Sequence, residues 1–94
     1  MKQKSFPDLA EAEVIALKAL AFLAEEPERF GRFLALTGTD LAQIPEAARS
    51  PGFLSGVLDH VRGDQSLLFI FAESAGLKPE DIDKAAARLE GQAP

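Results

Sequence analysis

Residues 64–76 read DQSLLFIFAESAG, and the six consecutive apolar residues at 67–72 are the strongest structural signal in the chain. A run of this length fits either a buried strand or a buried segment of helix. The helix is favoured because Asp64 is a typical N-cap residue, Gly76 typically follows a helix C-terminus, and no second strand-like run exists for pairing. A helix that is apolar on every side is usually buried. We therefore expect this segment to be the central helix of an all-helical core.

The segments on both sides of this run also have the pattern of helices. Upstream, Ser50-Pro51 combines an N-cap residue with proline at the first helical position. The helix that begins there is expected to end at about Arg62. Its core-facing stripe consists of Phe53, Leu54, Val57, Leu58 and Val61. Downstream, Lys78-Pro79 opens a helix that runs to about Leu89 and ends before Gly91. Its inner face is predicted to contain Ile82, Ala85, Ala86 and Leu89.

The first half of the chain predicts a longer helix followed by a shorter one. Asp8-Leu9-Ala10-Glu11 fits a capping box, and Ser5-Phe6-Pro7-Asp8 offers a second frame, so a helix is expected to reach about Glu25. Its core stripe is predicted at three- and four-residue steps, with neighbours on two sides: Ala10, Val14, Leu17, Ala21 and Ala24, widened by Ile15 and Phe22.

A second helix is expected over residues 27–36, with Phe30, Phe33 and Leu34 on its apolar face and Gly38 after its end. Pro45 breaks residues 41–49 into short helical turns. All connections are short, which favours a compact bundle. The predicted fold is therefore all-α: a compact orthogonal bundle of five main helices plus a short broken helical segment, in one domain over residues 1–94.

Composition and charge restrict the classes of function. The 94 residues include no cysteine, which excludes disulfides, thiolate catalysis and cysteine-ligated zinc. The net charge of −5 disfavours nucleic acid and anionic membranes as partners. Lys2 and Lys4 could begin a signal sequence, but acidic residues follow them, and no apolar run approaches the ~18 residues of a membrane span. We expect a cytoplasmic protein that does not enter a membrane.

Ala72, Gly76 and Ile82 have the spacing of a DNA-binding helix-turn-helix. The second helix of that motif would occupy residues 79–90, which contain four carboxylates and two cations and so have a net charge of −2. A helix that reads DNA needs Arg, Lys, Asn or Gln near the phosphates and bases. The favoured interpretation is a plain helical hairpin that ends its first helix at Gly76.

Polar candidates for a catalytic or metal site are few. His60 is the only histidine, and helical geometry turns it about 100° from the neighbouring Asp59, so the two do not converge. Arg29 and Arg32 share one helix face and could form an anion pocket with Arg49 or Arg62, but salt bridges on a solvated surface are favoured. Acidic clusters at 25–28 and 80–83 lie at helix starts, where the helix dipole favours acids. We predict no catalytic residue, no metal ligand and no cofactor.

The chain contains seven phenylalanines, and six short helices cannot easily surround every side of the 64–76 segment. Some apolar side chains of this segment are therefore expected at the surface, where they could bind a partner. Phe69 and Ile70 are therefore candidates for an exposed interaction surface. The sequence leaves two binding partners possible for this surface. One is a second copy of the chain, since a two-fold dimer is the commonest oligomer, and the other is a dedicated protein partner.

The second half of the chain resembles a known family. The matching motifs are D-L-A-x-I-P-x-A-A at 40–48, P-x-F-L-x-x-V-L-D-x-V at 51–61 and D-x-x-L-L-x-x-F-x-x-x-x-G-L-x-P-E at 64–80. This pattern is similar to that of a family of short, uncharacterised bacterial proteins, a domain of unknown function. The resemblance implies a small helical bacterial protein and brings no activity or ligand with it. The expected function is a non-catalytic protein-interaction module. The alternative is a helix-turn-helix-like transcription accessory protein, and a small-molecule-binding bundle is a third hypothesis.

Overall fold

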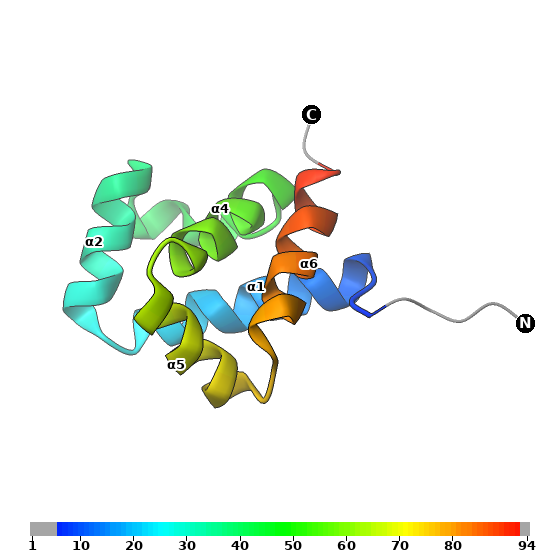
Figure 1. The fold of residues 1–94 in the computed structure, drawn as a ribbon. Helices are drawn as coiled ribbons and strands as arrows, with labels where there is room; N and C mark the ends of the chain where they lie inside the picture. The colour runs from blue at the N-terminus through cyan, green and yellow to red at the C-terminus, as the bar shows by residue number, and fades with distance from the viewer. Residues whose placement is uncertain (1–5, 93–94) are drawn as a thin grey trace, which may run out of the picture.

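The computed structural model describes residues 6–92, which fold into helices joined by short connections (Figure 1). The Ser5 capping frame and the Lys2 and Lys4 of the signal-sequence hypothesis lie outside the described residues. No strand occurs in the described part of the chain. The elements in chain order are α1 (Leu9–Ala24), α2 (Pro27–Thr37), a 3₁₀ turn η1 (Leu41–Gln43), α3 (Ile44–Ala47), α4 (Pro51–Arg62), α5 (Gln65–Ala75) and α6 (Pro79–Glu90). The all-helical class and the short broken segment after α2 are thus confirmed.

Local capping chemistry fixes the helix ends much as the sequence predicts. The Asp8 side chain accepts a hydrogen bond from the Glu11 backbone at 2.8 Å, and Glu11 accepts from the Asp8 backbone at 2.9 Å, which completes a capping box. Asp64 caps α5 by accepting from the Leu67 amide at 3.1 Å. Gly38 and Gly76 end α2 and α5 with φ of 68° and 69°, the left-handed conformation that glycine adopts without steric cost.

The core forms where α1, α4 and α6 pack on one another, and α6 crosses in front of α1 in Figure 1. Small residues at these crossings allow close approach of the backbones. The predicted inner faces of α4 and α6 are confirmed, with Phe53 only partly buried at the edge. The buried apolar side chains of this trio are Ala12, Ile15, Ala16, Ala19, Leu20, Phe22 and Leu23 of α1, Leu54, Val57, Leu58 and Val61 of α4, and Ile82, Ala85, Ala86 and Leu89 of α6.

The predicted core stripe of α1 is wrong for its five regularly spaced residues, which lie on the outside of the molecule, whereas Ile15 and Phe22, which were expected to widen it, are buried. Val14 and Leu17 are 49% and 43% exposed. The alanines of the same stripe, Ala10, Ala21 and Ala24, are exposed as well. The helix has apolar residues on both sides. The opposite side of α1 forms the core because its alanines let α4 and α6 approach closely.

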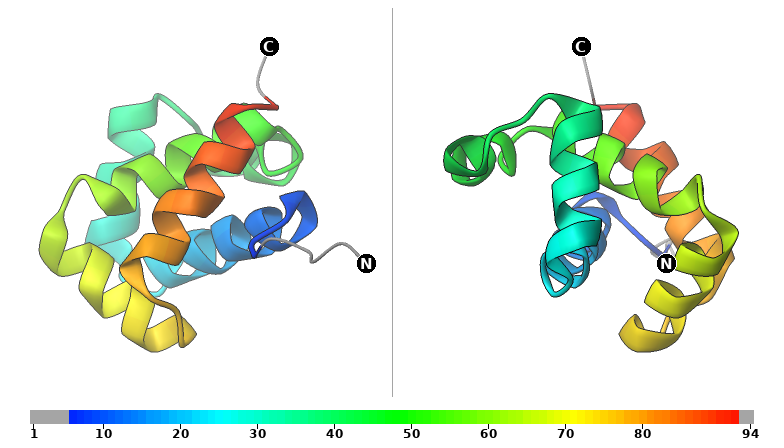
Figure 2. Two further views of the ribbon diagram at one scale, coloured as in Figure 1. Left: turned by 45° about the vertical axis from the view of Figure 1, so that its right-hand side comes forward. Right: turned by 90° about the vertical axis from the view of Figure 1, so that its left-hand side faces the viewer.

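The prediction that residues 64–76 form the central helix is also wrong. Of the α5 side chains, Leu67, Phe71 and Ala72 are buried, whereas Phe69 and Ile70 are half exposed. α5 packs mainly on α4 and forms one edge of the molecule, and the short segment η1–α3 lies at the opposite end (Figure 2). The central position belongs to α1, which contacts α2, α4, α5 and α6.

Two further contacts complete the architecture. α2 inserts Phe33 into the core, where its ring lies 5.9 Å from Phe53 and stacks at 6.3 Å on Phe30, so the predicted apolar face of α2 is confirmed. Arg88 of α6 donates a hydrogen bond to the Pro7 carbonyl at 3.0 Å, which ties the chain before α1 to the last helix. Among residues 6–92, no helix has the length and apolar character needed to cross a bilayer.

Candidate interaction surface

Phe69 and Ile70 form an apolar spot on the outer side of α5. Their side chains are 50% and 51% exposed. Glu73 lies between them on the helix surface, at the three- and four-residue spacings that place side chains side by side. The neighbouring Phe71 points the other way and is 1% exposed, with its ring 5.4 Å from Phe22. The spot is therefore carried on a helix whose inner side is fixed in the core.

A longer apolar surface follows the outside of α1, and we call it the outer α1 face. It consists of Ala10, Val14, Leu17, Ala21 and Ala24, all exposed. Sequence reasoning identified these residues as apolar and placed them in the core, so it missed them as a surface. The signal that could have corrected the assignment is the second alanine-rich stripe, Ala12, Ala16 and Ala19, on the opposite side of the same helix.

Two surface hollows run along one edge of α1, and both include Lys18 in their walls. The first has a volume of about 250 Å³ and lies between the N-terminal half of α1 and Leu77, with Phe6, Ala10 and Val14 in its lining. The second, about 260 Å³, lies between the C-terminal half of α1 and the Phe71–Ala75 end of α5. The edge of α1 that faces the α5–α6 corner is thus a shallow, largely apolar depression.

Arg29 and Arg32 line a third hollow of about 570 Å³ between α2 and the α4–α5 corner. Neither forms a salt bridge within the described residues, so the predicted salt bridges are wrong for this pair. Arg29 instead lies over the Phe22 ring at 4.8 Å from its centroid, a cation–π contact. Arg49 and Arg62 do not line the hollow, whose walls include the carboxylates of Glu26, Glu28, Asp59 and Asp64. Four carboxylates against two arginines do not favour an anion.

His60 lies at the boundary between this hollow and the core. Its ring contacts Phe33 edge-on, with the centroids 5.2 Å apart. Burial lowers the pKa of His60, the nearby Arg32 lowers it further, and Asp64 partly opposes this. The histidine therefore favours its neutral form. Within residues 6–92, no three potential metal-ligating side chains come together.

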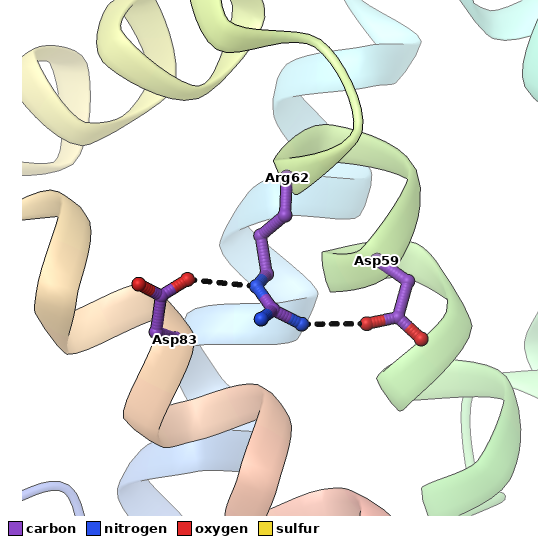
Figure 3. Close-up of polar contacts among 3 residues, drawn as sticks. All are labelled: Asp59, Arg62 and Asp83. Atoms are coloured by element: carbon purple, nitrogen blue, oxygen red, sulfur yellow. Dashed lines mark hydrogen bonds and ion pairs between the residues drawn. The ribbon is translucent and has the colours of Figure 1, made fainter.

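Asp59 lies beside Arg62, which joins two helices (Figure 3). The Arg62 guanidinium donates to Asp59 on its own helix and to Asp83 of α6, each at 2.8 Å. The hydrogen bond with Asp83 raises the already high pKa of Arg62, which is consequently always charged. This cluster links α4 to α6 on an exposed surface.

The helix-turn-helix hypothesis can be compared with the geometry of α5 and α6. The Leu77 amide donates to the Ala72 carbonyl at 2.8 Å across the Gly76 turn, which is the geometry of a helix C-terminal cap. Ile82 of α6 is fully buried. The exposed residues of α6 include the carboxylates Glu80, Asp83 and Glu90 and the cations Lys84 and Arg88, so this helix offers DNA no excess of positive charge.

A family described as a protein of unknown function, DUF3572, matches residues 9–92 of this chain. The match begins at the first residue of α1 and ends just beyond α6. No curated protein and no solved structure matches the chain.

Proposed function

We propose that this chain, which belongs to the DUF3572 family of proteins of unknown function, is a non-catalytic module that binds a protein partner through Phe69 and Ile70 of α5. The observation that carries the proposal is the exposure of two large apolar side chains, each about half accessible, next to each other on one helix. Exposed apolar patches rimmed by polar residues are typical of protein-interaction sites. Glu73, between the two side chains, supplies a polar group at this spot.

Burial of these two side chains would make a measurable contribution to the free energy of binding. Full burial of a Phe or Ile side chain contributes about 1.5–3 kcal/mol, and half of that remains available at each residue. Together the two side chains offer about 1.5–3 kcal/mol, which corresponds to an affinity change of roughly 10- to 150-fold. Because Leu67 and Phe71 fix the inner side of α5, ordering the helix costs little on binding.

The proposal is preferred over the two other hypotheses. A transcription accessory that contacts DNA through α6 would bring Glu80 and Asp83 toward the phosphates. A small-molecule site typically combines an apolar cavity with a few convergent polar groups. The largest polar hollow described above instead carries charges of both signs on its walls.

The test is a comparative capture from the native cell with the full-length chain as bait. Phe69→Ser and Ile70→Ser are expected to lose a partner that the unmodified chain recovers. The matched control is Leu41→Ser, which removes an apolar side chain that is 65% exposed on η1, at the opposite end of the molecule, and is expected to retain the partner. Unchanged thermal unfolding of all three variants shows that they remain folded.

The recovered partner is then purified and titrated against each variant. We expect its dissociation constant to rise at least about tenfold with Phe69→Ser, as is common when a central apolar contact is truncated. Recovery of the same partner at the same affinity by Phe69→Ser and Ile70→Ser would contradict the proposal.

A further inference from the structure

We infer that the outer α1 face is the interface of a homodimer in which two copies of α1 pack antiparallel about a two-fold axis. This inference concerns a different surface from Phe69 and Ile70 and is independent of the proposed function. The central helix of the fold, α1, has one apolar face in the core and a second one in solvent. Val14 and Leu17, the large residues of that second face, are 49% and 43% exposed.

Four of the five residues of the outer α1 face, all except Ala24, are spaced symmetrically. The residues Ala10, Val14, Leu17 and Ala21 follow one another at steps of four, three and four. Reversing the helix direction about the midpoint between residues 15 and 16 superimposes the pattern on itself. An antiparallel pair centred there sets Val14 level with Leu17 of the partner subunit, and Ala10 level with Ala21 of the partner subunit. The small residues at both ends allow the backbones to approach until the central four side chains meet.

The charges beside this face identify a second copy, in antiparallel orientation, as the occupant. At 100° per residue, Glu11 and Lys18 lie on the same flank of the face. A two-fold axis perpendicular to the helices brings like flanks together. It places each Lys18 about two residues, or roughly 3 Å along the axis, from Glu11 of the partner subunit, within reach of the lysine side chain. A parallel pair would instead place like flanks on opposite sides of the interface, so that Lys18 would lie away from Glu11 of the partner subunit.

A hollow beside Glu11 offers apolar walls and a carboxylate to a lysine side chain. The capping box holds one oxygen of Glu11 at 2.9 Å from the Asp8 amide and leaves the second oxygen for a cation. The 250 Å³ hollow adjoins this carboxylate and is walled by Phe6, Val14 and Leu77. The methylene groups of Lys18 of the partner subunit can lie along these apolar walls while the ammonium reaches Glu11. The same contact occurs twice, once on each side of the axis.

Sedimentation equilibrium of the full-length chain over about 10–100 μM tests the association. We expect a dimer of twice the 10.1 kDa chain mass. Leu17→Ser is expected to raise the dimer dissociation constant about tenfold or more, as for the truncation of a central interface residue. The control Leu41→Ser, on the exposed η1, is expected to leave it unchanged. A monomer over the whole range, or a dimer that Leu17→Ser does not weaken, would overturn the inference.

The absence of cysteine from the sequence permits a direct test of orientation. Single-cysteine variants Ala10→Cys and Ala21→Cys are purified separately, mixed, and oxidised under mild conditions. In the antiparallel dimer only the mixture yields cross-linked chains, because each position faces the other across the axis. Cross-linking of Ala10→Cys by itself, or no cross-linking in the mixture, would refute the arrangement. Phe69→Ser leaves both readouts unchanged, so failure here is distinguishable from failure of the proposed function.

Discussion

Replacing Phe71 by alanine probes whether the core extends into α5. The Phe71 side chain is 1% exposed, and its ring lies 5.4 Å from Phe22. Truncating a buried phenylalanine to alanine costs about 3–5 kcal/mol, from lost apolar burial and from the cavity left behind. Here the second surface hollow, about 260 Å³, adjoins both rings. Water can enter the new space from that hollow, so we expect a loss near the lower end, about 3 kcal/mol.

The matched control is Phe69→Ala on the same helix, where the side chain is 50% exposed. Both substitutions gain the same few tenths of a kcal/mol from the higher helix propensity of alanine, so this contribution cancels in their difference. Urea unfolding followed by circular dichroism measures both free energies of unfolding. We expect Phe69→Ala to cost less than about 1 kcal/mol. A loss below about 1 kcal/mol for Phe71→Ala, or equal losses for the two variants, would refute the packing argument.

Four further predictions address capping, protonation, surface charge and nucleic acid. Gly76→Ala is expected to destabilise the fold by about 1 kcal/mol in the same urea assay, because φ at this residue is +69°. Gly56 lies inside α4 with open space around a new methyl group, so Gly56→Ala is expected to stabilise the fold by about 0.5–1 kcal/mol. Because the folded state lowers the pKa of His60, its contribution to stability is complete above about pH 6.5 and declines as the pH falls below that value; His60→Asn should flatten this part of a stability–pH profile. Arg62→Ala is expected to cost less than about 1 kcal/mol, since its partners are exposed, and the loss should shrink further in high salt. Mixed-sequence duplex DNA is expected not to bind even near 100 μM protein at physiological salt, and a salt-sensitive gel shift at micromolar protein would instead favour the helix-turn-helix alternative.

The helix boundaries could be predicted from the sequence because they depend on local chemistry. The side chains of Asp8, Ser50 and Asp64 each accept a hydrogen bond from the backbone amide three residues further along the chain. Such contacts do not depend on the rest of the fold. Gly76 takes the left-handed conformation for the same local reason. The elements expected from these signals therefore correspond to those in the structure.

The buried side of α1 could not be predicted in this way. Alanines lie on both sides of the helix, so the periodicity of the sequence does not distinguish the inner Ala12, Ala16 and Ala19 from the outer alanines. The choice depends on which partner helices come close. The large residues Val14 and Leu17 remain outside because the inner side is occupied by close-packed α4 and α6.

The position of α5 required tertiary information for a similar reason. Its six apolar residues suggested a central helix, yet α6, with the small residues Ala85 and Ala86 on its inner side, packs along α1 and α4 instead. The sequence predicts Phe69 and Ile70 as surface candidates, and both are half exposed. Their role in binding a partner stays a prediction.

The attachment of α2 has a consequence for how the molecule opens. Phe33 is the one buried side chain of this helix, whereas α1, α4 and α6 each bury several. Regions with few buried apolar contacts separate from a protein at lower free energy than its core does. The amide hydrogens of α2 should therefore exchange with solvent through a partial opening that leaves the α1–α4–α6 trio intact, while the amides of the trio exchange only when the whole chain unfolds. The molecule therefore combines a three-helix core with a peripheral helix, α2, which is attached through Phe33 and the partly buried Phe30 and Leu34.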